Sequence, residues 1–152
     1  MTTTTTAMSF VQAAELLAAH LAEHAVPEPV FLTVTTRWGH SEVAAQLRPD
    51  TVPHLAAALL AWIDTLAAIT ITAWRPSESE RVHLSLACTL THPAGAVALT
   101  VYGAAKDHDP VRFGDLTPGQ RRTVSLSELR AWTAGEPTPT GSPVLDTPGA
   151  GR

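Results

Sequence analysis

The chain has 152 residues, of which 45% are hydrophobic and 16% are charged, and its formal net charge is −4. This length suits one domain with a sizeable core, and the negative balance excludes a long-range basic field that would attract nucleic acid. The single cysteine, Cys88, excludes an internal disulfide framework and a cysteine-rich zinc site, and no apolar run is long enough to span a membrane.

The two ends of the chain differ in composition from its middle. Residues 1–7 are mostly threonine and lack the charged and apolar regions of a secretory signal. Residues 136–152 mix proline, glycine, threonine and serine, and bury too little apolar surface to offset the entropy of ordering them. We therefore predict a disordered segment at 1–7, a single domain at 8–135 and a flexible tail at 136–152, in a cytoplasmic protein. The bias toward alanine and arginine is typical of a bacterial genome rich in GC.

Hydrophobic periodicity predicts a helix and then a hairpin in the first third of the chain. Over 8–25, apolar residues recur at helical spacing until two prolines end the pattern. The segments 31–38 and 42–48 alternate between apolar and polar residues, which is typical of half-buried strands. Gly39 and His40 are expected to form the turn between them.

The same periodicity predicts which side chains of these elements are buried. Phe10 and Leu17 share the apolar stripe of the first helix. Leu32, Val34 and Trp38 share the apolar face of the first strand.

A second helix and three further strands follow the hairpin. Asp50 or Thr51 is expected to cap the helix, since aspartate and threonine are favoured N-cap residues. Pro53 then lies in the first turn, where proline is tolerated. Strands are expected at 68–75, 81–91 and 96–103, with the clearest alternation in the second of them.

The end of the domain is predicted to be a loop followed by a short helix. The stretch 104–120 holds charged residues, prolines and glycines, which favour a loop. Ser125 and Glu128 have the spacing of a capping box, which opens a helix that ends near Gly135.

The predicted order of elements, α-β-β-α-β-β-β-α, indicates an α+β domain. We expect a five-stranded antiparallel sheet with the two amphipathic helices on one face and a short C-terminal helix. The segments FLTVTTRW and AITITAWR each follow an alanine- and leucine-rich helix, which suggests a duplicated α-β-β unit. This layout resembles that of small secretion chaperones, immunity proteins and other adaptors at the level of the fold.

The segment His20-Leu21-Ala22-Glu23-His24 matches the H-x-x-E-H pattern of the inverted zinc peptidases. Such a site needs two imidazoles one helical turn apart on the metal and a glutamate beside the metal-bound water. His20 and His24 have this spacing, but Glu23 projects about 100° away from His24 and no third ligand stands out on another helix. We therefore expect no metal and no cofactor, and retain His20, Glu23 and His24 only as weak metal candidates.

The sheet face opposite the helices, called the open face below, is the strongest candidate for a binding surface. Strand parity places Arg37, Trp74, His83 and Tyr102 on this face, among threonines and other short side chains. Tryptophan, tyrosine and arginine are the usual anchors of protein interfaces, and short neighbours permit close approach. The alternatives are a solvated polar face and, for Trp74, cover by the C-terminal segment.

These patterns favour a non-enzymatic protein-binding or adaptor module that uses its open face to self-associate as a homodimer or to bind another protein. The alternative is a small-molecule-binding protein or small enzyme with a pocket between sheet and helices near Arg37, Trp38, His40 and Trp74. A zinc-dependent hydrolase has the least support. We expect neither a membrane nor a nucleic acid as the partner.

Overall fold

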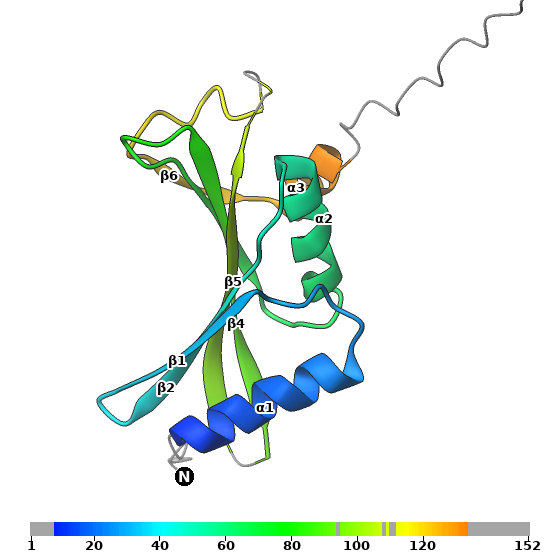
Figure 1. Ribbon diagram of the computed structural model, residues 1–152, viewed down its shortest axis with the longest axis vertical. Helices are drawn as coiled ribbons and strands as arrows, with labels where there is room; N and C mark the ends of the chain where they lie inside the picture. The colour runs from blue at the N-terminus through cyan, green and yellow to red at the C-terminus, as the bar shows by residue number, and fades with distance from the viewer. Residues whose placement is uncertain (1–7, 94, 108, 110–111, 134–152) are drawn as a thin grey trace, which may run out of the picture.

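The computed structural model describes residues 8–93, 95–107, 109 and 112–133. The predicted terminal segments and the predicted helix end near Gly135 therefore lie outside the described residues. The elements follow the chain in the order α1 (Phe10–Glu23), β1 (Phe31–Arg37), β2 (His40–Gln46), α2 (Val52–Ile63), β3 (Thr70–Trp74), β4 (Arg81–His92), β5 (Gly95–Lys106), β6 (Arg121–Val124) and α3 (Leu126–Thr133) (Figure 1).

The six strands form one mixed sheet in the order β1-β2-β5-β4-β3-β6. The α+β class is confirmed, but the expectation of five antiparallel strands was wrong in two respects. β6 adds a sixth strand antiparallel to β3, and β5 runs parallel to β2 while pairing antiparallel with β4. The parallel pair arises because the chain crosses over through α2 before the β4–β5 hairpin returns β5 to the free edge of β2.

Two helix–hairpin units are present, one made of α1, β1 and β2 and the other of α2, β3 and β4. Each hairpin is antiparallel. The two hairpins do not touch each other in the sheet, because β5 lies between β2 and β4.

The core lies between the sheet and the helices, with α2 and α3 on one side of the sheet (Figure 1). Alternate residues of β4, among them Val82, Leu84 and Leu86, are fully buried on this inner face. Trp62 of α2 is also fully buried, and its indole Nε1 donates a hydrogen bond of 3.1 Å to the carbonyl of Pro27. Burial of each such large side chain stabilises the fold by about 1.5–3 kcal/mol.

The N-terminal half of the fold departs from the predicted burial at three positions, of which Trp38 is described with the turn below. Phe10 is 54% exposed, because Ala13 and Leu17 are the residues that α1 turns to the core. Leu32 is 46% exposed, because β1 is an edge strand and has a neighbour on one side alone.

The β1–β2 hairpin turns at Trp38 and Gly39, one residue earlier than predicted. Both residues have positive φ, 52° and 78°, as the two-residue type I′ turn requires. Arg37 and His40 are paired across this turn. Trp38 is therefore 97% exposed at the tip of the hairpin, and the prediction that it faces the core was wrong.

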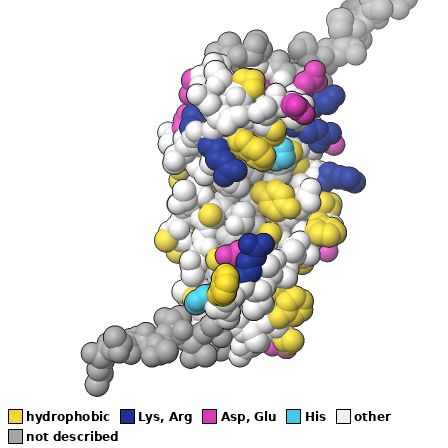
Figure 2. Space-filling model, turned by 90° about the vertical axis from the view of Figure 1, so that its left-hand side faces the viewer, with side chains coloured by type: hydrophobic (Ala, Val, Ile, Leu, Met, Phe, Trp, Pro, Cys, Tyr) yellow, Lys and Arg dark blue, Asp and Glu magenta, His cyan; other side chains and the backbone are white. Residues whose placement is uncertain are grey.

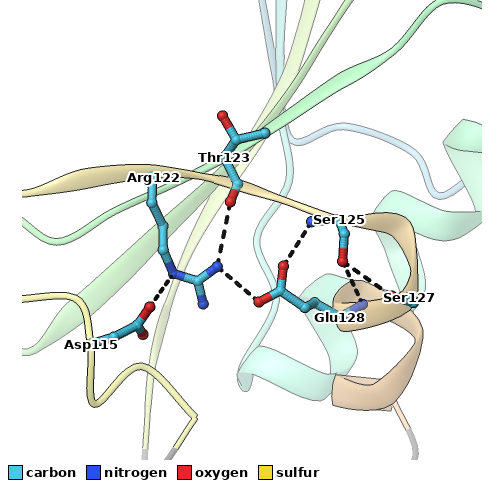
Figure 3. A network of polar contacts seen from close by, with 6 residues as sticks. All are labelled: Asp115, Arg122, Thr123, Ser125, Ser127 and Glu128. Carbon is cyan, nitrogen blue, oxygen red and sulfur yellow. Dashed lines mark hydrogen bonds and ion pairs between the residues drawn. The ribbon is translucent and has the colours of Figure 1, made fainter.

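Arg122 joins β6 to α3 on the inner face (Figure 3). Its Nε lies 3.1 Å from Asp115 Oδ2, its Nη1 donates a hydrogen bond of 2.9 Å to Glu128 Oε1, and the guanidinium lies 6.0 Å from the Trp132 ring. Glu128 accepts a hydrogen bond from the Ser125 N–H, and the Ser125 hydroxyl accepts one from the Glu128 N–H. The predicted capping box is thus confirmed.

We predict that Arg122→Met lowers the free energy of unfolding by about 1 kcal/mol, because the substitution removes two ion pairs and keeps most of the aliphatic stem. Urea unfolding followed by circular dichroism measures the change. Arg130→Met, at an exposed position of α3, is the matched control and should leave the midpoint unchanged. Equal midpoints for the two variants would contradict this role for Arg122.

Candidate functional site

The open face carries rows of side chains that run across the strands. One row joins Ala104, His83, Trp74 and Arg121, because His83 pairs with Ala104 and with Trp74, and Trp74 pairs with Arg121. Figure 2 looks at the side opposite α2 and α3, where hydrophobic, cationic and histidine side chains gather in the upper part of the surface, with a second mixed group in its lower part and white surface between them. The row therefore forms a local aromatic and cationic group on a face of short side chains.

Trp74, His83 and Arg121 form one cluster, called the Trp74 cluster below. The ring centroids of Trp74 and His83 lie 5.0 Å apart at an interplanar angle of 48°, and the Arg121 guanidinium carbon lies 5.0 Å from the Trp74 ring centroid. The second contact is a cation–π interaction. Burial, reinforced by the charge of Arg81, lowers the pKa of His83, so the imidazole is neutral at pH 7.

The Trp74 ring is half-buried, and its cover comes from the neighbouring strands. Within the described part of the C-terminal segment, Trp132 does not cover Trp74. It packs instead against Phe113 with ring centroids 4.7 Å apart, near Arg122 on the inner face. Arg121 was missed by the sequence reasoning, because 104–120 was taken to run as a loop to the last helix and β6 was not foreseen.

The remaining candidate residues lie elsewhere on the sheet. Arg37, Trp38 and His40 stand together at the β1–β2 turn, and Trp74 is four strands away, which corresponds to about 19 Å. Tyr102 lies between these groups on β5, where its hydroxyl is 3.4 Å from Gln46 Oε1. The four residues of the predicted pocket, Arg37, Trp38, His40 and Trp74, therefore do not line one common pocket between sheet and helices.

The histidines of the H-x-x-E-H segment take part in packing between α1 and α2. The His20 ring stacks on Trp62 with centroids 5.8 Å apart and contacts His24 at 4.5 Å, and its Nε2 is 2.9 Å from Thr65 Oγ1. Burial and the neighbouring His24 lower the pKa of His20, and Glu23 opposes them. Within the described ranges, no group of three or more His, Cys, Asp or Glu side chains could hold a metal ion.

A cavity of about 330 Å³ lies between α1 and the end of β4. Its volume is at the lower end of the range for small-molecule sites. It is lined by Met8, Gln12, Glu15, Leu16, Ala19 and His92.

We predict that acid weakens the fold partly through His20. The pKa of His20 in the folded state lies below its ordinary value of 6.5, so the unfolded chain takes up the proton first as the pH falls. The contribution of His20 to the free energy of unfolding is therefore fully present well above pH 6.5, and it declines as the pH falls through and below 6.5. Urea unfolding between about pH 7.5 and about pH 5.5 should give a shallower decline for His20→Asn than for the wild type.

The matched control for this measurement is His40→Asn, which removes an exposed histidine at the β1–β2 turn. Its pH dependence should parallel that of the wild type. If His20→Asn also parallels the wild type, the His20 account is wrong.

Within the described residues, no helix is long and apolar enough to cross a membrane. A scan against protein-family models, a search of curated proteins and a search of solved structures each find no match to the chain.

Proposed function

We propose that the protein is a non-enzymatic protein-binding module whose open face binds an acidic segment of a partner protein, with Trp74 as the anchor. The observation that carries this proposal is the Trp74 cluster, an aromatic ring held beside a cation on a sheet face that none of the three described helices covers. The support is physical: an aromatic ring supplies a large contact area, and cations beside it attract carboxylates.

The charge of the open face has the sign opposite to that of the whole chain. Four strand residues whose parity places them on this face are cationic and exposed, whereas one, Glu42, is acidic. The four cations are Arg37, Arg81, Lys106 and Arg121. The formal net charge of the whole chain is −4. An acidic partner is therefore attracted to the open face more strongly than to the rest of the molecular surface.

The Trp74 cluster is also ordered before any partner arrives. The indole is held between the His83 ring on one neighbouring strand and the Arg121 guanidinium on the other. A side chain that is already fixed loses little conformational entropy on binding. The adjacent row runs from Thr123 through Thr72 and Ser85 to Tyr102. Its three short side chains, nearest to the Trp74 cluster, leave room for a partner backbone.

The second candidate function is small-molecule binding in the cavity beside α1. Glu15 and His92 supply polar groups there, and Met8 and Leu16 supply apolar lining. This cavity lies away from the Trp74 cluster, so the two candidate functions involve different residues. A metabolite panel that raises the unfolding temperature of the wild type and of Trp74→Ala alike would favour the cavity.

We predict that Trp74→Ala weakens partner binding at least about tenfold, because a central aromatic anchor typically contributes that much or more. The immobilised full chain is used to capture proteins from a cell lysate, and each captured protein is identified, purified and titrated by calorimetry. Because cations contribute, binding should also weaken as salt is raised.

Thr89→Ala is the matched control, at an exposed position of β4 on the same face and away from the Trp74 cluster. It should keep the affinity within about twofold of the wild type. The proposal is contradicted if every purified partner binds Trp74→Ala as tightly as the wild type. It is also contradicted if nuclease treatment abolishes all capture, since the ligand would then be a nucleic acid.

A further inference from the structure

One edge of the sheet is unusually open to pairing with another strand. β1 is an edge strand of seven residues, so the backbone groups on its outer side have no partner among the six described strands. Proteins usually protect such edges with lysine, proline or a very short strand. The segment Phe31–Thr36 contains neither lysine nor proline and no charge. The other edge, β6, is protected, because it has four residues and two of them are arginines.

The exposed apolar side chains of the protein concentrate at this same edge. Six large apolar residues of the described chain are exposed, and four of them belong to β1, the residue before it and its turn. These four are Val30 (57%), Phe31 (61%), Leu32 (46%) and Trp38 (97%). The other two lie at the start of α1, which is tied to β2 by a hydrogen bond of 2.7 Å from the Ser41 hydroxyl to the Met8 carbonyl.

The turn geometry fixes which backbone groups of β1 point outward. In a two-residue hairpin the residues that flank the turn, here Arg37 and His40, form a hydrogen-bonded pair. Alternation along the strand then directs the N–H and C=O groups of Leu32, Val34 and Thr36 away from β2. These three residues are available for pairing with a further strand.

The strand is self-complementary about its middle residue. If a second copy pairs antiparallel with β1 about a two-fold axis at Val34, Val34 faces Val34, and Leu32 of each copy faces Thr36 of the other. All three outward-pointing residues of both copies are then paired, with about six hydrogen bonds. A shift by two residues in either direction leaves one of the three without a partner.

The side chains also match in this register. Phe31 comes opposite Arg37 of the second copy on the open face, and Val30 comes opposite Trp38, so exposed apolar surface meets apolar surface or a guanidinium that can lie on a ring.

We propose that the protein forms a two-fold symmetric homodimer by antiparallel pairing of β1 with β1 of a second copy, in the register centred on Val34. The two six-stranded sheets join edge to edge into one continuous sheet. Because the two-fold axis is perpendicular to the sheet, both open faces lie on the same side. This inference goes beyond the partner binding proposed above and uses a different surface.

Light scattering coupled to size-exclusion chromatography of the full chain tests the dimer. The wild type should elute with about twice the monomer mass of 16.1 kDa. Leu32→Lys places a charge on the exposed edge and should raise the dissociation constant at least about tenfold. Thr123→Lys, at an exposed position of the opposite edge strand, is the matched control and should remain dimeric. Circular dichroism shows that each variant is folded.

Disulfide formation between variants that each carry one introduced cysteine, besides the buried Cys88, tests the register. Thr33 of one copy faces Thr35 of the other in the non-hydrogen-bonded pair next to Val34, where the Cα atoms are about 4.5 Å apart and a disulfide is feasible. A mixture of Thr33→Cys and Thr35→Cys should therefore form cross-linked heterodimers under mild oxidation. Each variant alone should cross-link poorly, because identical positions lie about 7–8 Å apart.

A monomeric wild type at every concentration would overturn the inference. A dimer that Leu32→Lys leaves intact, or one in which the mixed cysteine variants do not cross-link, would overturn pairing through β1. Neither result affects partner binding at the Trp74 cluster, which its own titration tests. Conversely, if the protein forms a β1-paired dimer but its partners bind Trp74→Ala as tightly as the wild type, this inference stands and the proposed function is contradicted.

Discussion

The position of β5 between β2 and β4 is the constraint on which the rest of the structure depends. β5 pairs with β4 along its full length and with β2 over Glu42–Gln46, and so it joins the two hairpins into one sheet. Gly103 of β5 permits the close approach of α2, since a Cβ there would lie 2.8 Å from Leu55 Cδ1. As a consequence β1 becomes a free edge, and the β1–β2 turn lies far from Trp74.

The elements that local patterns specify were predictable from the sequence. The alternation along β4, the Thr51 cap of α2 and the Ser125–Glu128 capping box depend on neighbouring residues alone. Long-range pairing was not predictable in the same way. The residues of β6 form a strand because β3 offers them an edge, and neither their composition nor their length indicates a strand.

The candidate site was predictable where it depends on the alternation of side chains along a strand and on the pairing of consecutive strands. Trp74 and His83 face each other because β3 and β4 are consecutive antiparallel strands. Arg121 could not be joined to them without knowledge of β6. Trp38 was misplaced because it was assigned to the strand, with the turn expected at Gly39 and His40. A bulky aromatic residue with positive φ, as Trp38 has in the observed turn, is uncommon. The features that sequence reasoning missed are therefore those set by long-range pairing and by the turn geometry.

The sheet has a distinct role on each side. Its inner face supplies the apolar burial that stabilises the domain, whereas its open face and its β1 edge carry the aromatic and cationic side chains that burial does not use. In the proposed dimer, these surfaces cooperate because two Trp74 clusters stand on one side of a joined sheet. A partner with two acidic segments would then bind with increased avidity.

Amide hydrogen exchange measured residue by residue, at a high and a low protein concentration, tests most directly whether the β1 edge is a contact surface. The account predicts that the amides of Leu32, Val34 and Thr36 exchange slowly at high concentration and rapidly on dilution. The amides of Thr33 and Thr35, which bond to β2, should stay slow at both. Rapid exchange of the first three amides at every concentration, with the second pair still protected, would contradict it.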